Sequence, residues 1–65
     1  MRGVPPDELK AGQSYSLLLK CGREVHGRFI RIDLLEQQQV IVLAAESEQL
    51  RHVCCCEVDQ IEAVK

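Results

Sequence analysis

Histidine and cysteine gather near the C-terminal end of this 65-residue chain, in the stretch from His52 to Cys56. Thiolates and imidazoles are good zinc ligands, and a cysteine beside a histidine is also the pattern of a nucleophilic thiol with its base. On a regular strand His52, Cys54 and Cys56 share one face, with successive Cα atoms about 6.7 Å apart. Ligands on one straight strand cannot easily surround a tetrahedral ion, and no third group that would orient a catalytic base is evident. The sequence therefore predicts neither a metal centre nor a catalytic thiol.

Glu57 and Asp59 are the remaining residues that could do chemistry, as a general acid and base. Their place beside a predicted turn favours a pair of solvated carboxylates instead. We therefore predict that the chain is not an enzyme and uses no cofactor.

The cysteines favour a different interpretation, because a buried cysteine behaves as a small apolar residue. On a strand, Val53 and Cys55 point to one face while Cys54 and Cys56 point to the other. A strand that is apolar on both faces needs cover on both, and in a chain this short the outer cover is another subunit. We expect a homo-oligomer with these interface residues: His52, Cys54, Cys56 and Val58.

A second group of candidate residues is basic and lies within residues 20–31. The whole chain holds 8 Lys and Arg against 10 Asp and Glu, a net charge of −2, so its total charge does not indicate a nucleic-acid partner. The local cluster nevertheless supplies the cations that phosphate contacts need. The alternative interpretation is a set of solubilising charges on a hairpin. The candidate RNA contacts in this cluster are Lys20, Arg23, His26, Arg28 and Arg31.

The elements that must position these residues are short and mostly β. Alternating and β-branched apolar residues predict strands over residues 14–20, 24–33, 38–45, 50–56 and 58–64. A helix over residues 34–45 is the alternative for the third strand, and the run Val40–Leu43 argues against it. The N-terminal arm, residues 1–12, is expected to hold a short helix from Pro5 to Lys10 that ends by Gly12.

Two glycines shape the first predicted hairpin. Cys21-Gly22 is expected to be its tight turn, because glycine tolerates a positive φ. Gly27 marks a bulge, a sharp bend or a close approach of another backbone. Val25 and Phe29 are predicted on one face of the second strand, and Ile30 and Ile32 on the other. A bent second strand allows a small sheet to curl, so we predict a five-stranded barrel.

This pattern resembles the Sm-like family of small, SH3-like β-barrels, which includes bacterial Hfq. The resemblance covers residues 6–64 and rests on Leu19-Lys20-x-Gly22, on Val25-x-Gly27-x-Phe29-x-x-Ile32-Asp33 and on the later strands at Val40–Leu43 and Val58-x-x-Ile61. It implies a single barrel domain that binds RNA as a homo-oligomeric ring. It also implies an amide contact to a base in the loop after Asp33, where Gln37 is the candidate.

The chain is also similar to the Rho-binding antiterminator family, through the runs Leu17–Gly22, Val40–Arg51 and Val58–Ile61. That similarity implies a small acidic protein that binds the termination factor Rho rather than RNA. The leading prediction is thus a non-catalytic Sm-like module that binds RNA as a ring. The alternative is a protein-binding regulator of transcription termination.

The cellular location is predicted from what the sequence lacks. Residues 1–10 contain no apolar core of a signal peptide, and no apolar run reaches transmembrane length. We therefore expect a cytoplasmic protein without a membrane partner, in which the cysteines remain free thiols.

Overall fold

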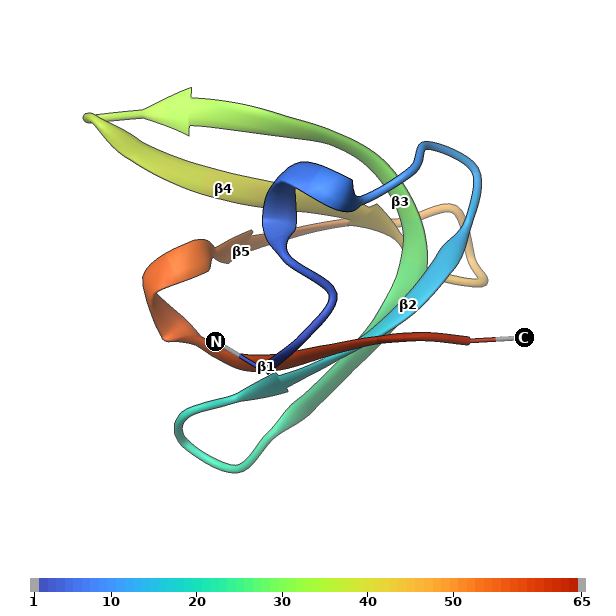
Figure 1. Ribbon diagram of the computed structural model, residues 1–65. Helices are drawn as coiled ribbons and strands as arrows, with labels where there is room; N and C mark the ends of the chain where they lie inside the picture. Colours follow the sequence, from blue (N-terminus) through green and yellow to red (C-terminus); the bar gives the residue numbers. More distant parts are fainter. Residues whose placement is uncertain (1, 65) are drawn as a thin grey trace.

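The computed structural model describes residues 2–64, which form one strongly curved, six-stranded sheet with two short 3-10 turns (Figure 1). The strand order is β1-β6-β2-β3-β4-β5, and every neighbouring pair is antiparallel except β1 with β6. The mostly β class is confirmed. Closure into a barrel is not, because no ladder joins β1 to β5 among the described residues. The elements are β1 (Arg2–Gly3), η1 (Pro6–Glu8), β2 (Ser14–Leu19), β3 (Glu24–Leu35), β4 (Gln38–Ala44), β5 (Leu50–Cys54), η2 (Cys55–Glu57) and β6 (Val58–Ala63).

The connection between β3 and β4 is shorter than the sequence predicts. β3 continues to Leu35, and only Glu36 and Gln37 form the turn, with φ of 50° and 66°. Positive φ at both central residues gives a two-residue turn that matches the twist of the flanking strands. The predicted end of the second strand at residue 33 is therefore wrong. A two-residue turn of this kind usually contains glycine, and without one the turn could not be recognised in the sequence.

The predicted N-terminal helix is reduced to the single 3-10 turn η1. Leu9 is already extended, with φ −67° and ψ 137°, so the turn ends before Gly12. A helix of one or two turns has little stability of its own. The segment is held instead by Val4 and Leu9, which pack against the core, and by the Lys10 N–H, which donates to the Tyr15 hydroxyl at 2.9 Å.

The core lies on the concave side of the curved sheet. Tyr15 and Phe29 meet edge to face, with ring centroids 6.3 Å apart and an interplanar angle of 88°. Ile32 packs against the same cluster as Phe29, so the predicted common face of Ile30 and Ile32 is wrong. The register of β3 against β4 shifts between Phe29 and Arg31, and this bulge at Ile30 restarts the alternation. The buried cluster consists of Tyr15, Leu17, Phe29, Ile41, Leu43, Val53, Val58 and Ile61.

Of the three roles foreseen for Gly27, the close approach is confirmed. A Cβ atom there would lie 2.9 Å from the Ala44 carbonyl oxygen, and the bulge sits three residues further on. Gly22 has φ +94°, as the predicted turn requires.

The strand predicted over residues 50–56 ends at Cys54, and η2 follows it. The Val58 N–H donates to the Cys55 carbonyl, and the Lys20 N–H donates to the Glu57 carbonyl at 2.8 Å. These bonds turn the chain from β5 into β6 and tie the turn to the end of β2. The two residues that flank this corner, Val53 and Val58, are both buried, so core packing holds the turn in place.

Candidate binding site

The six candidate RNA contacts are all exposed, and the fold does not bring them together. Lys20 and Arg23 flank the β2–β3 turn, whereas Gln37 lies in the β3–β4 turn, at the opposite end of β3. The other three, His26, Arg28 and Arg31, are spread along β3 between these ends.

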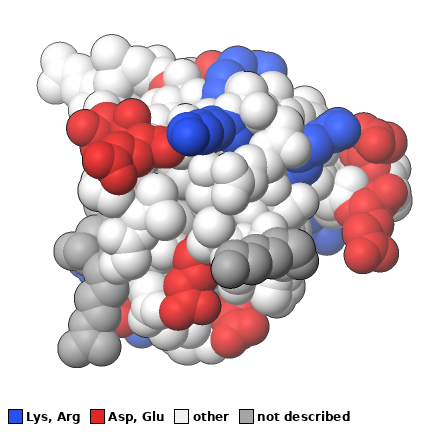
Figure 2. Space-filling view, turned by 45° about the vertical axis from the view of Figure 1, so that its right-hand side comes forward, with Lys and Arg blue, Asp and Glu red and all other residues white. Residues whose placement is uncertain are grey.

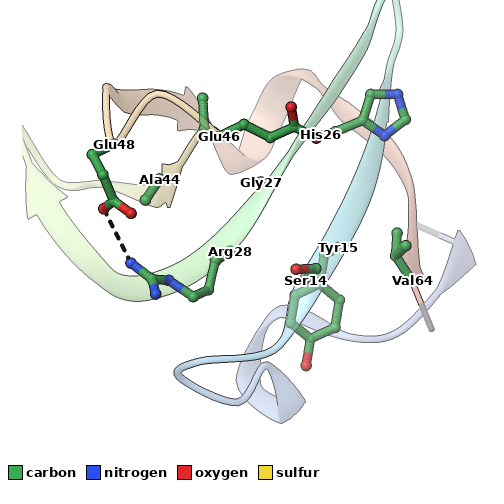
Figure 3. Close-up of a pocket in the computed structure, with 10 residues that line it drawn as sticks. Ser14, Tyr15, His26, Gly27, Arg28, Ala44, Glu46, Glu48 and Val64 are labelled. Atoms are coloured by element: carbon green, nitrogen blue, oxygen red, sulfur yellow. Dashed lines mark hydrogen bonds and ion pairs between the residues drawn. The ribbon is translucent and has the colours of Figure 1, made fainter.

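His26 and Arg28 line a shallow depression of about 440 Å³ between β2, β3 and the end of β4 (Figure 3). Glu46 and Glu48 line the same depression, and the Arg28 guanidinium lies 3.3 Å from the Glu48 carboxylate. The two carboxylates in the lining outnumber its one guanidinium group. The depression is therefore a poor place for a phosphate.

A second hollow, of about 400 Å³, lies between the start of β3 and β5, and we name it the β3–β5 groove. Arg23 and His26 line it from the β3 side, Arg51 and His52 line it from β5, and the carboxylates of Glu24 and Glu57 belong to the same lining. Within residues 2–64 neither Arg23 nor Arg51 has a carboxylate at ion-pair distance. Arg51 was missed by the sequence analysis, because only the pairing of β5 with β4 brings it near the first hairpin.

Acidic side chains accompany most of the basic cluster. His26 Nε2 lies 3.4 Å from Glu24, and Arg31 Nε donates to Asp33 at 2.9 Å, in addition to the Arg28–Glu48 pair. Such exposed pairs contribute little stability, but they offset positive charge locally. In the view of Figure 2, Lys and Arg side chains are interspersed with Asp and Glu side chains and with uncharged residues.

The predicted interface residues divide between surface and core. His52 and Cys56 are exposed and Cys54 is half-buried, but Val58 is only 2% exposed and its side chain belongs to the core. Val58 therefore offers no side-chain surface to a partner.

The backbone of β5 is nevertheless open to pairing. β5 is the last strand of the sheet and has β4 as its one neighbour. Because the Ala45 N–H donates to the Gln49 carbonyl, the antiparallel alternation turns the backbone groups of Leu50, His52 and Cys54 outward. The opposite edge differs, since β1 covers β6 at Gln60 and Ile61.

The end of the β3–β4 hairpin is a surface that the sequence analysis missed, because it placed these residues in a polar loop. Leu34 is 70% exposed and Leu35 is 54% exposed, although both belong to β3. The hairpin projects beyond the end of β5, at the upper left of Figure 1. Neighbouring strand residues point to opposite faces, so the hairpin end carries an exposed leucine on each face.

The Cys55 and Cys56 thiols of the cysteine stretch lack the lowered pKa that marks a catalytic nucleophile. Burial raises the pKa of the Cys55 thiol, and a hydrogen bond with Cys54 raises the pKa of Cys56. A raised pKa leaves a smaller fraction of the thiol as the reactive thiolate at neutral pH, which slows its reactions without preventing them. The described part of the chain holds no group of three or more His, Cys, Asp or Glu that could bind a metal ion. Residues 2–64 also contain no helix with the length and apolar character needed to cross a bilayer.

No protein-family model matches this chain, and no curated protein or solved structure matches it. The surfaces described above are thus the observations on which a function can be based.

Proposed function

We propose that this chain is a non-catalytic binding module with the architecture of an Sm-like barrel, and that its ligand is another protein. The barrel is supported by four strands that follow one another in the sheet, by a strongly bent β3, and by β6, which returns to pair with β2. This order agrees with the resemblance of the sequence to Sm-like proteins.

The exposed pair Leu34 and Leu35 is the observation that carries the choice of a protein ligand. Apolar side chains on a projecting hairpin lose contact with water when they enter a pocket of another protein. They offer nothing to a phosphate backbone, which is bound by cations and hydrogen-bond donors. The hairpin end is therefore proposed as the anchor of a protein–protein contact.

The charges of the molecule support the same choice. Three of the five basic side chains in the cluster lie beside carboxylates, and the whole chain has a net charge of −2. Such a molecule has a weak field for attracting nucleic acid. The similarity to Rho-binding antiterminators supplies a specific partner, the termination factor Rho, and a role as a cytoplasmic regulator of transcription termination.

RNA binding is the second candidate, and the β3–β5 groove favours it. Arg23 and Arg51 line this groove without a carboxylate at ion-pair distance among the described residues, so both guanidinium groups can contact a phosphate. Glu24 and Glu57 in the same lining, however, balance their charge. The homo-oligomeric ring predicted from the sequence belongs to this second candidate function, RNA binding. A ring needs two different sheet edges, and opposite β5 the sheet ends in the two-residue β1, which would have to leave β6 to expose a longer edge.

The test is a titration of the immobilised chain with purified Rho, run beside titrations with labelled oligo-U and oligo-A at low and moderate salt. We expect saturable binding of Rho and none of either RNA. The double variant Leu34→Ser/Leu35→Ser should weaken Rho binding at least about tenfold, or about 1.4 kcal/mol. The matched control is Leu50→Ser, since Leu50 is 45% exposed at the opposite end of the β4–β5 pair and should not matter.

RNA binding that falls with salt, and that disappears in Arg23→Gln/Arg51→Gln, would replace the protein proposal with the second candidate. Failure to bind Rho would remove that partner. Equal loss of binding in the Leu34/Leu35 variant and in Leu50→Ser would remove the hairpin end as the anchor.

A further inference from the structure

Cys54 and Cys56 stand side by side at the corner between β5 and η2. Their Sγ atoms are 2.8 Å apart, and the chain contains no disulfide among its four cysteines. On a continuous strand the two Cα atoms would be about 6.7 Å apart. The tighter rise of a 3-10 turn, about 2.0 Å per residue, brings Cys56 back toward Cys54 and into the range that a disulfide spans.

Hydrogen bonds orient both thiols. The Cys54 thiol donates to the Gln38 side-chain oxygen at 3.2 Å, which leaves its sulfur free to accept from the Cys56 thiol. Cys56 is exposed, so a small molecule in solution can reach it first. Cys55 lies between them in the sequence but packs against the core, so its side chain is turned away from the pair.

We propose that Cys54 and Cys56 are a reversible dithiol–disulfide pair, a modification site that is independent of the partner proposed above. The oxidant is a small-molecule disulfide such as oxidised glutathione. The Cys56 sulfur, after losing its proton, attacks this disulfide, forms a mixed disulfide and releases one thiol. The Cys54 sulfur, also deprotonated, then attacks the Cys56 sulfur and displaces the second thiol.

In this exchange the protein gives up two protons and two electrons, and one small disulfide becomes two thiols. Excess reduced thiol reverses the reaction. Closure removes the Cys54 hydrogen bond to Gln38 and ties the end of the edge strand β5 to η2. The disulfide thus fixes the corner between β5 and η2, and reduction to the two thiols releases it. This corner lies beside the open edge of β5.

The experiment equilibrates the full chain in glutathione buffers of graded ratio, quenches with acid, alkylates and measures the intact mass. We expect Cys54 and Cys56 of the wild type to lose their alkylatable thiols without taking up glutathione, as peptide masses after digestion will show, whereas the exposed Cys21 should take up glutathione as any single thiol does. Cys54→Ser and Cys56→Ser should each accumulate a stable glutathione adduct. Cys21→Ser and Cys55→Ser should close as the wild type does.

Repeating the titration in denaturing urea tests whether the folded structure favours the disulfide by holding the Cys54 and Cys56 thiols close together. The ratio of oxidised to reduced protein at a given buffer should be at least about tenfold higher in the folded chain, a difference of about 30 mV. Equal ratios in both states, stable glutathione adducts on Cys54 or Cys56 of the wild type, or loss of closure in Cys55→Ser would each overturn the proposal. Because Cys56 is exposed, Cys56→Ser should fold normally, and its circular dichroism spectrum checks this.

Discussion

Gly27 lies so close to Ala44 that a Cβ atom at residue 27 would come within 2.9 Å of the Ala44 carbonyl oxygen. The same atom would lie 2.9 Å from the Cβ of Leu43, which is fully buried. Neither a backbone oxygen nor the first carbon of a core side chain can rotate away. The bent part of β3 can therefore pass the end of β4 only with glycine at this position, and the curvature of the sheet depends on it.

Gly27→Ala should destabilise the protein by about 1–3 kcal/mol, because the added methyl group overpacks the contact with β4. Urea unfolding followed by circular dichroism measures the change. Gly22→Asn is the matched control, since Gly22 has open space around it and asparagine tolerates its left-handed φ. That control should cost less than about 1 kcal/mol. A Gly27→Ala variant as stable as the wild type would show that the two backbones are not in contact.

Tyr15→Phe should cost about 1 kcal/mol, because it removes the hydroxyl that accepts the Lys10 N–H at 2.9 Å. The ring and its edge-to-face contact with Phe29 remain. Amide hydrogen exchange should become faster at Lys10 and stay unchanged at Gly12, whose N–H donates to the Phe29 carbonyl. Equal acceleration at both amides would mean that the substitution loosens the whole N-terminal segment and not one bond.

The stability of the fold should depend on the protonation of Cys55. Burial raises the pKa of its thiol above the ordinary value of 9.0, so the folded state holds this proton more tightly than the unfolded state. The stabilising contribution is fully present below pH 9.0 and is lost as the pH rises through the raised folded pKa. Urea midpoints measured through this range should fall more for the wild type than for Cys55→Ala. Parallel curves would contradict this prediction.

Alternation and turn chemistry were enough to locate the five main strands. Tyr15 and Leu17 are two residues apart, as apolar residues on one face of a strand are, and Gly22 indicates the turn that follows this strand. The errors in the predicted strand faces and strand ends arise where the two-residue alternation is interrupted and no glycine or proline marks the interruption. The bulge at Ile30 carries no glycine, and the turn at Glu36-Gln37 has two positive φ angles on residues that usually avoid them.

The candidate site was harder to predict, because it depends on partners that are distant in sequence. Arg28 meets Glu48, which lies twenty residues away, only after β3 and β4 have paired. The exposure of Leu34 and Leu35 follows from the length of a hairpin that extends past β5, which composition cannot reveal. Counting charges along the sequence therefore overestimated the positive charge of the basic cluster. It also did not reveal the apolar surface formed by Leu34 and Leu35.

The N-terminal strand β1 covers one edge of the sheet, and Gly3 makes this possible. Gly3 has φ +78°, and a Cβ atom there would lie 1.9 Å from the Ile61 carbonyl oxygen. Gly3→Val should therefore lift β1 from β6 and open a second sheet edge. Since β5 is already open, β5 of one copy could then pair with β6 of the next.

We expect Gly3→Val to shift the protein toward larger oligomers at micromolar concentration, measured by native mass spectrometry and sedimentation velocity. Gly12→Val is the matched control, because Gly12 also has a positive φ, of +91°, but nothing lies within 4 Å of its Cβ position. Faster exchange of the Val4 amide, which donates to Ile61, would confirm that β1 has detached. A detached β1 without any change in mass would mean that the free edge of β6 is not sufficient for assembly, and the ring would lose its structural basis.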